Sequence, residues 1–176
     1  MDNSYEYYNE IAKGYDELHK EEQLSKFRVI NNTISIKSST KILDVGCGTC
    51  LSYNFFTCDW KGIEPAKKMI QKNPNSKKLF EEKRVFVLPA ESIKKLFNEN
   101  EFDVIICVST AHHFTNLEIV IKQMKKICKN NGDIVFSLLK TTNNCEKIKS
   151  QIKNNLKVKN TVDEGKDIIL FCKNAL

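Results

Sequence analysis

The sequence lacks any long apolar run, any internal repeat and any proline-rich linker. No stretch approaches the roughly 18 apolar residues that a membrane-spanning helix needs, so no membrane association is expected. The first ten residues, Met1–Glu10, are acidic and rich in Tyr and Asn, which speaks against a signal or transit peptide. We therefore expect a single cytoplasmic domain over residues 1–176, long enough to bury a full α/β core.

The cysteines do not form a set that suggests disulfides or a metal site. There are seven, an odd number, and some lie inside apolar runs, such as Cys107 and Cys172. Buried free thiols in a reducing compartment fit this pattern better than a disulfide framework. No second C-x-x-C and no His pair at ligand spacing accompany Cys47 and Cys50, so we expect no metal.

The net charge of +6 is distributed unevenly along the chain. Residues 122–176 hold twelve Lys against five acids, while residues 1–121 are nearly balanced. A basic surface attracts nucleic acid or anionic substrates, so a nucleic-acid partner stays open. The alternative is a general composition bias, because Lys and Asn are abundant throughout the chain.

The hydrophobic periodicity predicts two N-terminal helices followed by alternating strands and helices. Apolar residues at three- and four-residue spacings predict N-terminal helices over Tyr5–Lys20 and Glu21–Ile36. The expected strands are short apolar runs: Lys41–Val45, Trp60–Ile63, Arg84–Leu88, Phe102–Val108, Asp133–Leu139, Leu156–Val162 and Asp167–Lys173. The expected later helices are a helix capped by Thr49 and running to Phe56, then Ala66–Lys72, Ser92–Phe97, Leu117–Lys129 and Asn144–Lys153.

This order predicts an α/β fold with a doubly wound, Rossmann-like sheet of seven strands. The sheet should be mostly parallel, with helices on both faces and an antiparallel C-terminal strand from the closing hairpin. Residues 1–38 would form an N-terminal helical cap and residues 39–176 the core. Ligands of such sheets bind beyond the carboxyl ends of the strands, beside the first strand.

The turn after the first strand contains glycines that allow close approach to a ligand. Gly46 and Gly48 follow Asp44 and precede a helix, whose N-terminal N–H groups suit an anion such as a carboxylate. Glu64 ends the second strand, where a carboxylate can accept hydrogen bonds from ribose hydroxyls. The dinucleotide fingerprint requires a third glycine where Leu51 stands, and Asp44 would repel a pyrophosphate. S-adenosylmethionine (SAM), a cation with an amino-acid end, fits this pattern better than NAD.

The sequence also resembles class I SAM-dependent methyltransferases over nearly its whole length. ILDVGCGTC is similar to their first motif, although Cys50 stands where a small glycine is usual, and KGIEP, FVLPAES, FDVIICVSTAHHF and GDIVFSLL resemble the later motifs in order. Tyr7-Tyr8, Ala12 and Tyr15-Asp16 resemble the N-terminal helix of the methyltransferase type 11 branch. The resemblance implies SAM as cofactor and these cofactor-binding residues: Tyr15, Asp44, Gly46, Cys47, Gly48, Glu64, Pro65, Ala90, Glu91, Cys107 and Val108.

The loop after the fourth strand is the expected approach of the methyl acceptor. His112 and His113 titrate near neutrality, so either is a candidate catalytic base, or one packs under a helix while the other faces solvent. The acceptor is expected to be a small molecule because the cap is small. A tRNA, RNA or protein acceptor using the Lys-rich C-terminal third remains an alternative, as does a non-catalytic SAM-binding module. Enzymes that methylate exocyclic amino groups of bases resemble Asn/Asp-Pro-Pro-aromatic here, whereas this chain has Val-Ser-Thr-Ala.

A competing interpretation of the same turn is dithiol chemistry. Cys47-Gly48-Thr49-Cys50 is a C-x-x-C sequence at a strand-to-helix turn, where a helix N-terminus would lower a thiol pKa. The similarity to thioredoxin-like proteins ends at these four residues.

Overall fold

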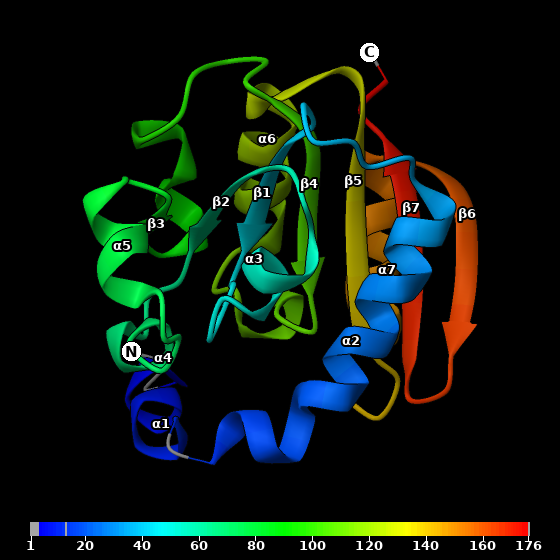
Figure 1. Cartoon of the computed structure of the whole chain (residues 1–176). Coiled ribbons are helices and arrows are strands. Elements are labelled where there is room, and N and C mark those ends of the chain that lie inside the picture. Colours follow the sequence, from blue (N-terminus) through cyan, green and yellow to red (C-terminus); the bar gives the residue numbers. More distant parts are fainter. Residues whose placement is uncertain (1–3, 13, 176) are drawn as a thin grey trace.

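The computed structural model describes residues 4–12 and 14–175 (Figure 1). A single sheet lies between two layers of helices. Its strands are β1 (Lys41–Val45), β2 (Asp59–Ile63), β3 (Val85–Phe86), β4 (Phe102–Val108), β5 (Cys128–Leu139), β6 (Lys157–Glu164) and β7 (Asp167–Lys173). The α-helices are α1 (Ser4–Ile11), α2 (Tyr15–Thr33), α3 (Leu51–Phe55), α4 (Lys67–Ile70), α5 (Ser76–Glu81), α6 (Leu117–Ile127) and α7 (Cys145–Asn155). Two short 3-10 helices are η1 (Ala90–Lys95) and η2 (Ala111–His113).

The seven strands are ordered β3-β2-β1-β4-β5-β7-β6. Strands β1 to β5 pair in parallel, and β7 runs antiparallel to both of its neighbours, β5 and β6. The predicted fold class is confirmed. The strand order reverses between β1 and β4. At such a switch point a crevice forms beyond the carboxyl ends of the two strands, and this is where ligands of open α/β sheets bind.

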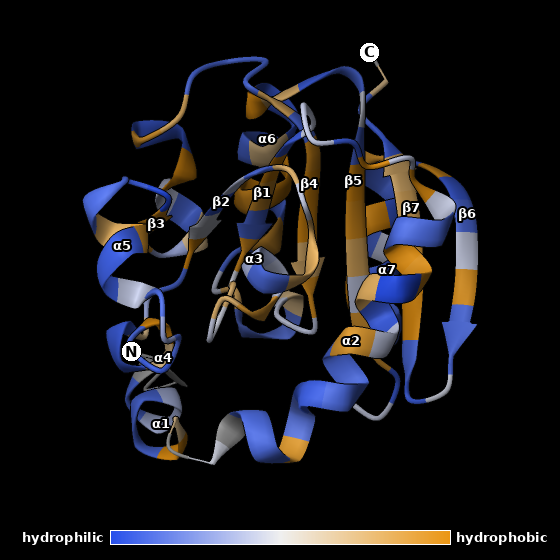
Figure 2. Ribbon diagram, in the orientation of Figure 1, coloured by the Kyte–Doolittle hydropathy of each residue, from blue (hydrophilic) through white to orange (hydrophobic). Residues whose placement is uncertain are grey.

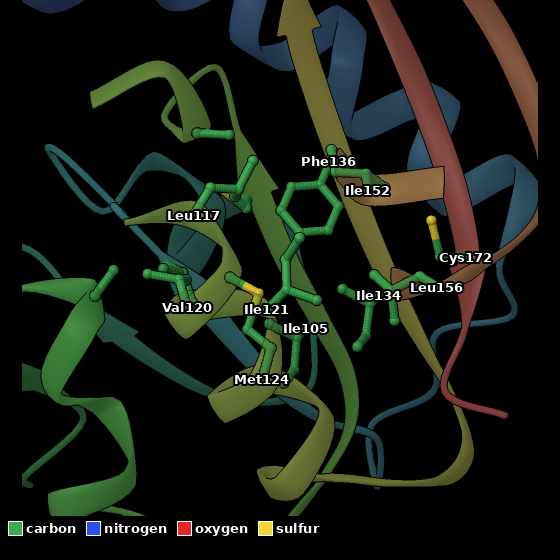
Figure 3. Close-up of a cluster of buried hydrophobic side chains, with 14 of the residues drawn as sticks. Ile105, Leu117, Val120, Ile121, Met124, Ile134, Phe136, Ile152, Leu156 and Cys172 are labelled. Atoms are coloured by element: carbon green, nitrogen blue, oxygen red, sulfur yellow. The ribbon is translucent and has the colours of Figure 1, made fainter. Parts of the chain in front are cut away.

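The central strands β1, β4, β5 and β7 are mostly apolar and buried because helices cover both faces of the sheet, whereas the edge strand β6 is polar and mostly exposed (Figure 2). On one face, Leu117, Val120, Ile121 and Met124 of α6 pack on β4 and β5, as Figure 3 shows for Ile105, Ile134 and Phe136. These α6 residues recur every three or four positions, which places them along one side of the helix.

On the other face, Phe27 and Ile30 of α2 pack against β1 and β4, together with Trp60 of β2. Both residues are buried, Ile30 completely. The C-terminal half of α2 lies in front of β5 and β7, and its N-terminal half extends past the carboxyl edge of the sheet (Figure 1). None of the helices within the described ranges has both the length and the apolar character that crossing a membrane requires.

Several element boundaries differ from the sequence expectation. Helix α1 ends at Ile11 and α2 begins at Tyr15 after the N-cap residue Gly14, whereas the sequence pattern placed the boundary between the two helices at residues 20–21. Helix α6 ends at Ile127 and not at Lys129, since Cys128 already pairs with Phe102 as the start of β5. Helix α5 was not predicted.

The early end of α6 has a tertiary cause. The side-chain amide of Asn174 donates to the carbonyls of Lys125, Cys128 and Lys129 at 2.8, 2.9 and 3.2 Å. It thereby satisfies carbonyls that the terminated helix leaves without partners. Asn174 lies 46 residues away from Cys128 in sequence, so no local pattern could have revealed this contact.

Candidate functional site

A pocket with about 950 Å³ of empty space lies at the carboxyl edge of β1, β2 and β4. Its walls come from the turn after β1, the ends of β2 and β4 with the segments that follow them, the segment from Leu88 to Glu91, Tyr8 of α1 and one face of α2. This volume includes the open mouth of the pocket, and its position at the carboxyl edge is that of a small-molecule or cofactor site in an open α/β sheet.

The glycine turn can only be built with glycine at position 46. Gly46 has a φ of +78°, and a Cβ there would lie 2.2 Å from Cγ2 of Thr110 in the loop after β4. The backbone N–H groups of Gly46 and Cys47 both donate to the carbonyl of Ile63, at 2.9 and 3.0 Å. The turn is therefore held between β2 and the loop after β4, and Gly48, with a φ of +52°, continues it into the pocket wall.

Glu64 connects the end of β2 to the glycine turn. Its Oε2 accepts from the backbone N–H of Gly48 at 3.0 Å, and its Oε1 from that of Ala66 at 2.8 Å. Burial raises the pKa of the Glu64 carboxyl, while these two hydrogen bonds act in the opposite direction. The side chain lines the pocket in a fixed orientation, with lone pairs left to accept hydrogen bonds from a ligand.

Asp44 places a second buried carboxyl at the pocket, next to the glycine turn. Ser52 of α3 donates to its Oδ2, and the indole Nε1 of Trp60 donates to the Ser52 hydroxyl at 3.0 Å. Burial raises the pKa of Asp44 to about 7, and the charge of Glu64 adds to the shift. A cation bound here would stabilise the ionised form of Asp44, since two close carboxylates without one repel each other.

The structure brings most of the predicted site residues to this pocket. Besides the residues above, the pocket is lined by Cys47, Pro65, Ala90, Glu91, Val108 and His113. Cys107 does not line it, because successive strand residues point to opposite faces and its side chain is fully buried in the core on the α6 side. The side chain of Tyr15 lies outside the described part of the structure.

His112 and His113 face different surroundings although they are adjacent. His113 lines the pocket, and its Nε2 lies 2.7 Å from the hydroxyl of Tyr8 in α1. His112 lines a second hollow between the starts of α6 and α7. Burial lowers the pKa of the His112 imidazole. Only His113 is placed where an acceptor in the pocket could reach it.

The α2 wall of the pocket was missed by the sequence argument. Asp16, His19, Lys20, Gln23 and Phe27 line it. They recur at intervals of three and four residues, so they share one side of the helix, and this periodicity was the available signal. The hydroxyl of Thr49 donates to Oδ1 of Asp16 at 2.7 Å, which ties α2 to the glycine turn. Thr49 therefore does not cap α3; Cys50, with a φ of 58°, occupies that N-cap position.

The two cysteines of the turn are close but are not in an activating environment. The Sγ atoms of Cys47 and Cys50 lie 3.7 Å apart, and both residues are buried free thiols. Burial raises the pKa of the Cys47 thiol well above its usual value, with neighbouring Asp44 and Glu64 acting in the same direction. A reactive thiolate requires the opposite shift, so the dithiol interpretation has no electrostatic support here. Across the described ranges no group of three or more His, Cys, Asp or Glu could hold a metal ion.

Comparison with known proteins agrees with this architecture. A family model described as a methyltransferase domain matches residues 36–170. The protein MJ1252 of Methanocaldococcus jannaschii is 29% identical over 170 residues, which are 93% of this chain and 63% of that protein. The malonyl-[acyl-carrier protein] O-methyltransferase of Priestia megaterium is 28% identical over 137 residues, 74% of this chain and 48% of that enzyme. The chain therefore spans less than two thirds of either relative.

Among solved structures, a SAM-dependent methyltransferase from Aquifex aeolicus superposes with a TM-score of 0.68 at 16% identity. The match covers 84% of this chain and 89% of that one, and at this identity it shows the fold alone. With the family match over residues 36–170, the strand order and the pocket at the switch point, the chain belongs to the methyltransferase-domain family, in the class I SAM-dependent group.

Proposed function

We propose that this chain binds SAM in the pocket beside β1 and transfers its methyl group to a small-molecule acceptor. One observation carries the proposal: two buried carboxyls, Asp44 and Glu64, converge with the Gly46–Gly48 turn on one pocket. Buried acids without a basic partner favour a cationic ligand, and the open glycine backbone favours close approach of that ligand.

The residues present fit such a cofactor without rearrangement. Glu64 is already oriented by two backbone N–H groups, so it can accept hydrogen bonds from ribose hydroxyls. Asp44 supplies negative charge for the ammonium group of the methionine end. Leu88 and Ala90 supply an apolar wall for the adenine, beside Glu91. When bound, SAM supplies a methyl group on a sulfonium. This methyl group is readily transferred because S-adenosylhomocysteine, a neutral thioether, is an excellent leaving group.

The contribution of the protein is then mainly alignment and exclusion of water. Helix α1 covers the pocket through Tyr8, whose hydroxyl meets His113 at 2.7 Å and whose ring stands edge-to-face against the imidazole at 5.1 Å. His113, whose Nε2 is engaged by the Tyr8 hydroxyl, can orient the acceptor from the pocket wall. The walls from α1 and α2 leave space for a small acceptor more readily than for a folded macromolecule, which supports the small-molecule choice.

Calorimetry tests the cofactor part directly. We expect SAM and S-adenosylhomocysteine to bind the purified protein, and NADH not to bind. Glu64→Ala should weaken S-adenosylhomocysteine by roughly ten-fold or more, because hydrogen bonds to a charged group contribute about 1.5–3 kcal/mol. The matched control is Glu99→Ala, which removes an exposed carboxylate outside the pocket and should leave binding unchanged. Binding of NADH without binding of either adenosyl ligand would contradict the proposal.

A further inference from the structure

The ionisable residues of the pocket are divided between its two sides. Asp44, Glu64 and Glu91 lie on the side formed by β1, β2 and η1. His19 and Lys20 lie on the opposite side, on α2. The acidic side matches a cationic cofactor. The side with His19 and Lys20 is therefore available to the methyl acceptor, which must face that cofactor.

The α2 side also holds one acidic residue, Asp16, but its carboxylate already has a hydrogen-bond partner in the glycine turn. Asp16 accepts a hydrogen bond from the Thr49 hydroxyl, so its carboxylate is directed to the glycine turn. Glu22, six residues further along α2, pairs with Lys26 at 2.8 Å and with Lys166 at 3.4 Å and does not line the pocket. Lys20 makes no ion pair with any carboxylate of the described residues; it is exposed and lines the pocket.

The other residues on the α2 side of the pocket are aromatic side chains and one side-chain amide. Phe27 of α2, Phe114 of the loop after β4 and Tyr8 of α1 also line the pocket. The amide of Gln23 lies between Lys20 and Phe27 on the same helix face. An acceptor on the α2 side of the pocket therefore has both aromatic rings and a lysine side chain among its neighbours.

From this arrangement we infer that the methyl acceptor is a small organic anion, with a carboxylate bound at Lys20 and an apolar or aromatic body between Phe27 and Phe114. The inference rests on the proposed function, because it assigns the acceptor half of the same pocket. Lys20 is the specificity-determining residue: it selects the charge of the acceptor and takes no part in methyl transfer.

The experiment uses the full chain saturated with S-adenosylhomocysteine, with 3-phenylpropionate and benzoate as anionic probes. Their neutral amides, 3-phenylpropionamide and benzamide, have nearly the same shape. We expect the acids to bind about five-fold more tightly than the amides, as a partly exposed ion pair allows. Lys20→Glu should abolish or reverse that preference, and Lys20→Arg should retain it.

The control is Lys37→Glu, which changes net charge equally at an exposed lysine outside the pocket and should leave the preference intact. Equal binding of acids and amides to the wild type, or a preference that survives Lys20→Glu, overturns the inference. In both cases S-adenosylhomocysteine binding, measured in the first titration, remains, so the proposed function is judged separately. If S-adenosylhomocysteine does not bind in the first titration, both the proposed function and the inference about the acceptor are wrong.

Discussion

The ammonium of Lys26 lies 3.2 Å from Oδ2 of Asp167, and neither side chain has any exposed surface. Lys26 comes from α2 and Asp167 from the start of β7, so this ion pair joins the helix to the strand that it covers. Ser109, the pocket residue after β4, lies between them: Lys26 donates to its hydroxyl at 2.9 Å, and that hydroxyl donates to Asp167 at 3.0 Å. The ion pair therefore holds Ser109, a residue that lines the pocket, in place through hydrogen bonds to its hydroxyl.

Removing one charge of this pair should be severely destabilising. Lys26→Met keeps the aliphatic stem but leaves Asp167 buried without its cation, which costs about 3–5 kcal/mol. Chemical denaturation would measure the loss as a lower transition midpoint. The double variant Lys26→Met/Asp167→Asn should recover part of it, because no uncompensated charge remains. A single variant as stable as the wild type would contradict a structural role for the pair.

The fold was largely predictable from sequence, but this buried pair was not. The apolar runs of β1, β4 and β7 mark strands that are covered on both faces, and the one-sided pattern of Leu117–Ile127 marks a helix packed on them. Lys26 reads as an ordinary helix lysine, since only a strand beginning 141 residues later shows that it is buried. Local periodicity indicates which face of a helix is apolar, and it does not indicate which charges meet across a sheet.

Gly46→Ala should abolish binding of S-adenosylhomocysteine and destabilise the fold. A Cβ at this position would lie 2.2 Å from Cγ2 of Thr110, and φ is +78°. The steric overlap and the backbone strain each cost about 1–3 kcal/mol, so together they lower the free energy of unfolding by several kcal/mol. Calorimetry and thermal unfolding would measure the two effects.

Gly165→Ala is the matched control for this substitution. Gly165 also has a positive φ, +59°, but nothing lies within 4 Å of the added Cβ. It should cost only the backbone strain, about 1 kcal/mol, and leave ligand binding intact. Adding Thr110→Ser to Gly46→Ala removes the nearest methyl group and should restore some stability. Equal effects of the two alanine substitutions would mean that the contact with Thr110 is unimportant.

The candidate site was predictable where residues follow strands and not where they come from helices. Asp44, Gly46 and Glu64 were found because each stands at the carboxyl end of a strand next to the switch point. Cys107 was chosen by its position in a motif, although alternation along β4 turns it to the opposite core. The α2 wall, with Lys20 and Gln23, was missed because only the docking of the whole helix decides that this face covers the pocket.

The double variant Cys47→Ser/Cys50→Ser should still bind S-adenosylhomocysteine, with a dissociation constant within a few-fold of the wild type. Both thiols are buried, Cys47 lines the pocket, and burial raises the pKa of the Cys47 thiol away from any reactive range. Calorimetry measures the binding. In parallel, the wild type should not accelerate insulin disulfide reduction by dithiothreitol. An acceleration that the double variant loses would favour the dithiol interpretation instead.

The pH dependence of stability should report the buried carboxyl of Asp44. Its pKa is raised from 3.8 to about 7, so between these values the folded protein holds a proton that the unfolded chain has released. Stability from this group is fully present below about pH 4 and is lost as pH rises through about 7, by on the order of 4 kcal/mol. Compared with Asp44→Asn, the wild type should therefore lose urea resistance between pH 5 and pH 8. Parallel curves for the two proteins would contradict the shifted pKa.

Ligand binding should show the opposite trend from the same group. The ammonium of S-adenosylhomocysteine favours ionised Asp44, so affinity should rise between pH 6 and pH 8 as the carboxyl releases its proton. The rise should approach ten-fold per pH unit while Asp44 is mostly protonated and level off above its pKa. Asp44→Asn keeps an acceptor for Ser52 but has no charge to titrate, so its affinity should be weaker and flat across this range. A wild-type affinity that is equally flat would mean that the ligand ammonium lies away from Asp44, and the orientation proposed for the methionine end would be wrong.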